Sequence, residues 1–129
     1  MPTLKKLTPI LFVDQIEPSI PFWVDRLGYT RTAEVPHGDR LGFLILEKDG
    51  TEIMYQTRAS VEADASAIAE GLAMRGSILF IEVDDLAAVE RALEGAEIIL
   101  PRRTTSYGAT EVFVREPAGN VVGFAQFGG

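Results

Sequence analysis

The chain has 129 residues, of which 47% are apolar and 24% charged, which fits one ordinary globular domain and excludes a disordered or fibrous chain. It contains no cysteine and one histidine, which excludes disulfides, thiolate chemistry and a histidine-rich metal site. The formal charge of −7 repels phosphate backbones, so nucleic acid is not an expected partner. We find neither an apolar run long enough to span a bilayer nor a signal peptide, so we expect a cytoplasmic protein without a membrane partner.

The first half of the chain predicts one strand, one helix and three further strands. The helix is indicated by apolar residues at helical spacing, with Trp23 inside the stripe and Gly28 at the position of a C-terminal cap. We interpret Trp23 as packing this helix on a sheet. Asp49-Gly50 between two apolar runs is typical of a hairpin turn. In chain order the predicted elements are the strand 7–13, the helix 14–28 and the strands 29–35, 40–47 and 51–57.

The second half repeats the order of the first after an alanine-rich stretch. Val13-Asp14 matches Val83-Asp84 at an offset of 70 residues, and a rival offset of 68 keeps the same side chains on the same sheet face. The repeat predicts one domain, 1–129, made of a first βαβββ module at 1–57, a connector helix at 58–76 and a second module at 77–129. The elements predicted for the second module are the strand 77–83, the helix 84–95 and the strands 96–100, 110–115 and 120–126.

Each module is expected to have one face covered by its helix and one bare face. Side chains alternate along a strand, so Leu11 and Val13, with Ile81 and Val83, are predicted to lie under the helices. The bare faces are then predicted to carry Thr8, Ile10 and Phe12 in the first module and Ile78, Phe80 and Glu82 in the second. The predicted fold class is α+β: two βαβββ modules related by a pseudo-twofold, with curved mixed sheets that form a cup for a ligand.

Several motifs support this arrangement by their order along the chain. The run SIPFWVDRLGY at 19–29 follows a strand that begins Pro9-Ile10-Leu11, REPAGN at 115–120 precedes the last strand, and Tyr107-Gly108 stands shortly before Glu111. Together these motifs resemble the vicinal oxygen chelate superfamily of glyoxalases, extradiol dioxygenases and bleomycin resistance proteins. The resemblance covers essentially the whole chain, and the run at 22–28 is nearest to the bleomycin-resistance-like branch. It implies the glyoxalase/bleomycin resistance fold.

The resemblance also implies where a metal ion would bind. Metal-using members carry His or Glu ligands at four cup-face positions, which in this sequence are Thr8, Met54, Ile78 and Gly123. None of these side chains suits a divalent ion, which prefers imidazole, thiolate or carboxylate donors. Glu52 and Glu82 share the cup face but do not rebuild the site. We therefore expect no metal and no cofactor, and we assign no catalytic residue.

A ligand site is expected on the cup face. A carboxylate on an inward-facing strand position needs a partner, so Glu82 and Glu111 are each predicted to meet an arginine, to stay at the wet rim or to await a cationic ligand. Arg115, which faces the same side of the strand as Glu111, is the candidate partner for it. His37 stands in a turn sequence and is interpreted as a solvated residue rather than a general base. The residues predicted to line the site are Phe12, Met54, Phe80, Glu82, Tyr107, Glu111 and Phe113.

Three functions remain open from the sequence. The first is a metal-independent protein that sequesters a small molecule, for which a cationic aromatic antibiotic is one candidate; the family resemblance implies a homodimer with clefts between subunits. The second is an enzyme with an atypical site, a lyase, isomerase or dioxygenase-like protein using Glu82, Glu111 and Tyr107. The third is a packed dimer with no ligand. The sequence leaves open whether one chain or two form the cup.

Overall fold

Two four-stranded sheets organise the chain in the computed structural model, which describes residues 3, 5–70 and 77–128. The strand order is β1-β4-β3-β2 in the first sheet and β5-β8-β7-β6 in the second. The neighbours β1 and β4 run parallel, as do β5 and β8, and all other neighbouring strands are antiparallel. The strands are β1 (Ile10–Val13), β2 (Thr30–His37), β3 (Arg40–Lys48), β4 (Thr51–Thr57), β5 (Leu79–Glu82), β6 (Glu97–Thr104), β7 (Ala109–Arg115) and β8 (Val121–Phe127).

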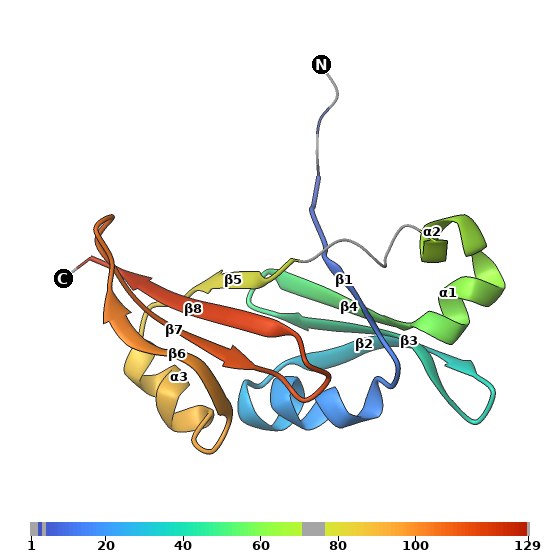
Figure 1. Ribbon diagram of the computed structural model, residues 1–129, viewed down its shortest axis with the longest axis horizontal. Coiled ribbons are helices and arrows are strands. Elements are labelled where there is room, and N and C mark those ends of the chain that lie inside the picture. Colours follow the sequence, from blue (N-terminus) through green and yellow to red (C-terminus); the bar gives the residue numbers. More distant parts are fainter. Residues whose placement is uncertain (1–2, 4, 71–76, 129) are drawn as a thin grey trace.

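The helical segments are η1 (Glu17–Ser19), η2 (Phe22–Arg26), α1 (Arg58–Asp64), α2 (Ser66–Glu70) and α3 (Leu86–Ala92). Figure 1 shows the helical turns of residues 17–26 and α3 below the two sheets, whereas α1 and α2 lie beyond the right-hand end of β4. The connector predicted at 58–76 is two short helices, α1 and α2, and its residues 71–76 lie outside the described residues. No described helix has the length and apolar character needed to cross a membrane.

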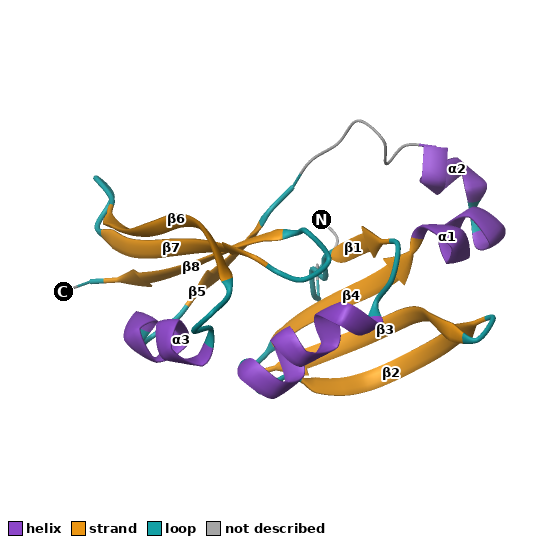
Figure 2. Ribbon diagram, turned by 60° about the horizontal axis from the view of Figure 1, so that its bottom comes forward, coloured by secondary structure: helices purple, strands orange, loops and turns teal. Residues whose placement is uncertain are grey.

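The order of elements confirms the predicted α+β fold class, with a β-helix-βββ unit on each side of the connector. Figure 2 shows the two sheets as separate bodies, with η1 and η2 against the first and α3 against the second. Strand positions also agree with the prediction to within a few residues. The turn Lys48-Asp49-Gly50 joins β3 to β4, with positive φ at Asp49 and Gly50, as a two-residue hairpin turn requires.

The first helical segment departs from the regular helix predicted over 14–28. It forms a 3-10 turn, η1, followed by a π-helical turn, η2, with Pro21 between them. Pro21 has no N–H, so it cannot continue a ladder of backbone hydrogen bonds. Gly28 ends the segment as predicted: its φ is +79°, and the amides of Gly28 and Tyr29 reach back to the carbonyls of Val24 and Trp23 at 3.1 and 2.8 Å.

The core lies between the sheets and these helical segments. Leu11 and Val13 are buried and Ile81 and Val83 are partly buried against the core, as the alternation of side chains predicts. Trp23 is fully buried, which confirms its predicted packing role. The other large buried apolar side chains are Ile16, Phe22, Tyr29, Leu44, Leu46, Ile53, Tyr55, Leu86, Leu93, Val112, Val114, Val122 and Phe124.

A buried carboxylate joins the two modules within this core. Glu116, which is 1% exposed, comes from the β7–β8 turn and accepts hydrogen bonds on Oε2 from the hydroxyls of Ser19 and Tyr55, both at 2.7 Å. Its Oε1 accepts from the backbone and side-chain amides of Asn120 at 2.7 and 3.1 Å. Trp23 Nε1 in turn donates to the Tyr55 hydroxyl at 2.8 Å. These donors compensate the desolvation of the carboxylate without a cation.

This network predicts a loss of stability in alkaline solution. Burial, and then the neighbouring Glu116 carboxylate, raises the pKa of Tyr55 above its usual value near 10. The unfolded chain ionises this tyrosine near pH 10 while the folded chain does not, so this contribution to stability is present below pH 10 and is lost as the pH rises above it. Urea unfolding of Tyr55→Phe should therefore show a shallower fall between pH 9 and 11 than the wild type. Equal slopes would contradict the assignment.

Candidate functional site

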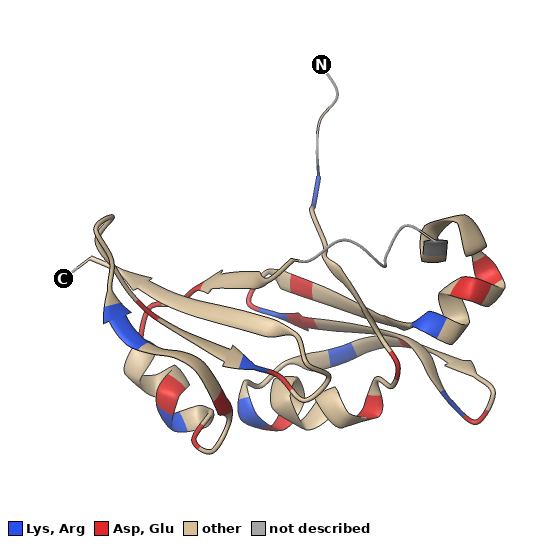
Figure 3. Ribbon diagram, in the orientation of Figure 1, with Lys and Arg blue, Asp and Glu red and all other residues tan. Residues whose placement is uncertain are grey.

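The sheet faces that point away from η1, η2 and α3, here called the open face, carry the strand residues predicted to line a ligand site. The registers Ile10↔Met54 in the first sheet and Phe80↔Gly123↔Phe113 in the second place these side chains in rows across the strands. Figure 3 shows that β8, in the middle of the second sheet, carries no charged residue. The open face of each sheet is thus apolar at its centre.

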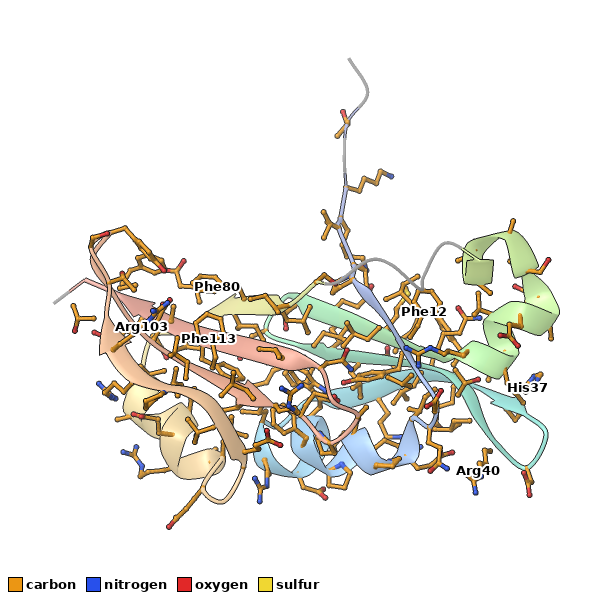
Figure 4. All side chains as sticks on the ribbon, in the orientation of Figure 1. Phe12, His37, Arg40, Phe80, Arg103 and Phe113 are labelled. Atoms are coloured by element: carbon orange, nitrogen blue, oxygen red, sulfur yellow. The ribbon has the colours of Figure 1, made fainter. Side chains whose placement is uncertain are left out.

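The predicted site residues fall into two groups. Phe12 and Met54 lie on the first sheet, whereas the other five belong to the second sheet or to its β6–β7 hairpin. Figure 4 shows Phe80, Phe113 and Arg103 together on the second sheet, with Phe12 on the first. The second group is the more complete candidate site, because it combines aromatic and polar side chains.

An aromatic pair forms the centre of this second group. The rings of Phe80 and Phe113 lie 6.3 Å apart at an angle of 42°, and Phe80 is 48% exposed. Gly123, between them in the sheet, leaves the room that the Phe113 ring occupies: a Cβ at this glycine would lie 2.4 Å from a ring carbon. The absence of a side chain at Gly123 therefore positions the aromatic surface.

The buried carboxylate of Glu111 is paired, but not with Arg115 as predicted. Arg103 on the neighbouring strand β6 approaches Glu111 Oε1 with Nε at 3.0 Å and Nη2 at 2.9 Å. Arg115 instead contacts Glu97 and the carbonyl of Gly119. The prediction was wrong because a residue directly opposite in a sheet lies nearer than one further along the same strand, and Arg103 pairs with Glu111 across the β6–β7 ladder.

Tyr107 completes this polar group from the tip of the β6–β7 hairpin. Its hydroxyl donates to Glu111 Oε2 at 2.9 Å. Its ring remains 58% exposed and lies 6.1 Å from the ring of Phe127. Figure 1 shows this hairpin rising above the open face at one end of the second sheet. Tyr107 therefore covers the carboxylate and extends the aromatic surface.

The positions that correspond to metal ligands do not fit a metal ion. The Thr8 hydroxyl donates to Glu52 Oε1 at 2.8 Å, and Lys6 contacts the same oxygen at 3.1 Å, which together lower the pKa of Glu52. Gly123 has no side chain, and the Phe113 ring fills the space a ligand would need. Within the described part of the chain, no group of three or more His, Cys, Asp or Glu is placed to hold a metal ion. The side chains at these positions thus do not fit a metal centre of the usual family type.

His37 and a groove between the two modules lie apart from the aromatic pair. His37 is exposed at the end of β2, as expected for a turn residue, and Figure 4 places it away from the aromatic pair. A half-open groove of about 430 Å³ lies between η2 and the β3–β4 turn on one side and β5 and α3 on the other. Its polar groups already hold the fold together, since Lys48 Nζ donates to the Leu27 carbonyl and Asp85 caps α3. Of the predicted site residues only Glu82 lines this groove.

Comparison with known protein families identifies the superfamily to which the chain belongs. Residues 4–124 match the model of the Glyoxalase/Bleomycin resistance protein/Dioxygenase superfamily. The chain belongs to this superfamily. The glyoxalase/bleomycin resistance fold inferred from the motifs is thereby confirmed, and the match covers both modules. None of the curated proteins compared with the chain matches it in sequence.

Several solved structures have the same fold. A glyoxalase/bleomycin resistance protein/dioxygenase family enzyme from Burkholderia phytofirmans superposes with a TM-score of 0.74 at 18% identity, covering 93% of this chain and 96% of that one. Lactoylglutathione lyase from Agrobacterium tumefaciens gives 0.72 at 20% identity, covering 97% and 95%. TnmS3, an antibiotic binding protein from Streptomyces, gives 0.67 at 19% identity, covering 98% and 99%. Enzymes and a binding protein thus share this architecture, so the function has to be argued from the site.

Proposed function

We propose that this superfamily member binds a planar aromatic small molecule on its open face, without a metal ion, and sequesters it rather than transforming it. The observation that carries the proposal is the aromatic pair above Gly123, in which Phe80 is exposed and Phe113 is half-buried. Two aromatic rings side by side at the apolar part of a sheet face offer a stacking surface to a flat ligand. TnmS3, an antibiotic binding protein with the same fold, supports placement near the bleomycin-resistance-like branch.

The alternative of an enzyme with an atypical site is less well supported. Such an enzyme would need an acid–base pair directed at the substrate, and Glu82, Glu111 and Tyr107 were the candidates. Glu111 and Tyr107 are bonded to each other, and the carboxylate is 1% exposed beneath the hydroxyl and the Arg103 guanidinium. A carboxylate held in this way supports a structure and is poorly placed to exchange protons with a bound molecule.

A cationic group on the ligand would meet Glu82. This residue is exposed on the same face as Phe80, at the end of β5. Glu82 pairs with Ala125 on β8, which pairs in turn with Glu111 on β7. Because the Ala125 side chain is small, it leaves space on the open face next to Glu82. The net charge of −7 would draw cationic molecules towards the protein over longer distances.

A second copy of the chain is proposed to cover the open face. Ile10, Val35 and Phe80 are exposed on this face, and each lies on an edge strand of its sheet: β1, β2 and β5 respectively. Apolar sheet faces of this kind are seldom left in water by soluble proteins. A homodimer with a two-fold axis would enclose the open faces and form clefts between subunits.

Calorimetric titration with metal-free bleomycin, a cationic drug with planar heterocycles, tests the proposal. We expect saturable binding that Phe80→Ala weakens about fivefold or more, because part of the stacking surface is lost. The matched control is Ile98→Ala, which removes an exposed side chain from the opposite face of the second sheet. Binding that survives Phe80→Ala unchanged would contradict a site on the open face, and a flat titration would exclude this class of drug.

A further inference from the structure

Three side chains form the polar end of the open face on the second sheet: Arg103, Tyr107 and Glu111, here called the Arg103 cluster. Glu111 stands at its centre, with Oε1 bonded to Arg103 Nε and Nη2 at 3.0 and 2.9 Å and Oε2 bonded to the Tyr107 hydroxyl at 2.9 Å. The β6–β7 ladder aligns Arg103 with Glu111, so strand pairing fixes the ion pair. The guanidinium is therefore held in one orientation by the carboxylate behind it.

What a ligand meets at this end is the guanidinium. The Glu111 side chain is 1% exposed, whereas the Arg103 side chain is 54% exposed. A guanidinium carries five N–H groups, and Glu111 occupies two of them. The remaining N–H groups have no acceptor among the residues that the structure describes. The cluster thus presents donors to the open face and hides its acceptors.

The cluster lies within reach of the aromatic pair. Glu111 and Phe113 are two residues apart on β7 and point to the same face, which separates their Cα atoms by roughly 7 Å. Figure 4 shows Arg103 beside Phe113. A ring system stacked on Phe80 and Phe113 would bring a substituent on its edge to the Arg103 guanidinium.

We infer that the aromatic ligand of this protein carries an anionic oxygen, such as a carboxylate or phenolate, which Arg103 binds, and that Glu111 is a positioning residue for Arg103. This inference rests on the proposed function. From the sequence, a cationic ligand is one of the alternatives for Glu111. The geometry disfavours it, because a cation approaching Glu111 would first meet the guanidinium, whereas an anionic oxygen finds free N–H donors in a planar array.

A matched pair of fluorescent probes tests the sign of the contact: 2-naphthoate and 2-naphthylmethylammonium, which share a ring system and differ in charge. Each is titrated into the protein by fluorescence anisotropy. The double variant Arg103→Met/Glu111→Gln removes the cation without leaving a buried carboxylate unpaired. It should weaken naphthoate binding about 5–10-fold, the loss of one charge-assisted hydrogen bond near the surface, and leave the ammonium probe unchanged or tighter.

The single variant Glu111→Gln separates the two roles of the carboxylate. The glutamine Oε1 can still accept from Arg103 and so keeps the guanidinium in place, while the negative charge behind it is removed. We therefore expect naphthoate to bind equally well or up to about threefold more tightly. If Glu111 were itself the ligand contact, the ammonium probe would weaken instead, and the inference would be overturned. Circular dichroism melts of each variant establish that the protein remains folded.

Arg102→Met is the control for removing an arginine near the site. Arg102 precedes Arg103 on β6, is exposed and pairs with Glu90 on α3, so its loss removes a neighbouring guanidinium without touching the Arg103 cluster, whereas the double variant leaves the net charge unchanged. Naphthoate binding should change less than twofold. A double variant that weakens both probes equally, or neither, would overturn the anionic contact while leaving the aromatic site intact. Failure of both probes to bind the wild type would contradict the proposed function together with the inference.

Discussion

Replacing Glu116 with alanine is expected to lower the free energy of unfolding by about 3–5 kcal/mol, a loss at the upper end for single substitutions. The carboxylate accepts four hydrogen bonds, from the hydroxyls of Ser19 and Tyr55 and from both amides of Asn120. Its removal leaves these donors without partners in a site closed to water and opens a cavity between the modules. Urea unfolding followed by far-ultraviolet circular dichroism measures the change.

Two further variants make this measurement specific. Glu62→Ala removes a glutamate that is exposed on α1, and it should change the free energy of unfolding by less than about 0.5 kcal/mol. Glu116→Gln keeps the side-chain volume but replaces one acceptor oxygen with an NH2 group that faces other donors. It should therefore lower the free energy of unfolding by an intermediate amount, about 2 kcal/mol. The network would lose its assigned role if Glu116→Ala were no more destabilising than Glu62→Ala.

Gly123→Val is expected to destabilise the protein by about 1–3 kcal/mol and to abolish aromatic ligand binding. A Cβ at this position would lie 2.4 Å from the Phe113 ring, so the ring would have to leave its place on β8. The valine itself suits a strand, which means that the loss comes from the clash and not from the backbone. The affinity for 2-naphthoate and the urea midpoint report the two effects.

A double-mutant cycle isolates the clash. In the Phe113→Ala background the ring is absent, so Gly123→Val should cost nothing or stabilise the strand, which gives a coupling energy of about 1 kcal/mol or more. Ala125, the next open-face residue on β8, provides a comparison: it pairs with Glu111 and not with Phe113, so Ala125→Val should show little coupling to Phe113→Ala. Additive effects at Gly123 and Phe113 would show that the ring and the glycine do not share one space.

The faces of the strands were predictable because the side-chain period of a strand is fixed. Leu11 and Ile81 had to lie on the opposite face from Phe12 and Phe80 once the strands were placed, and the registers agree. The details of the first helical segment were less accessible. Pro18 and Pro21 each fit the first turn of a helix, but together they remove two backbone N–H donors, and the segment forms a 3-10 turn and a π-helical turn instead of one regular helix.

The polar contacts were harder to predict because they join residues distant in sequence. Arg103 reaches Glu111 through the β6–β7 ladder, whose register shifts between Leu100 and Arg103, and periodicity alone does not reveal such a shift. Glu116 belongs to the turn motif at 115–120, and this motif gives no indication that its side chain is buried. A signal was present in Tyr55, whose strand parity directs it into the core, where a hydroxyl requires a partner.

The hydrogen bonds to Glu116 also show how the two repeats depend on each other. The β3–β4 and β7–β8 turns occupy equivalent places in their modules, yet only the second sends an acid into the core, while Asp49 in the first turn is exposed. The first repeat supplies the hydroxyls of Ser19 and Tyr55, and the second supplies the carboxylate together with the two amides of Asn120. The two repeats are therefore complementary at this point, and separating them would remove both hydrogen bonds that Glu116 Oε2 accepts.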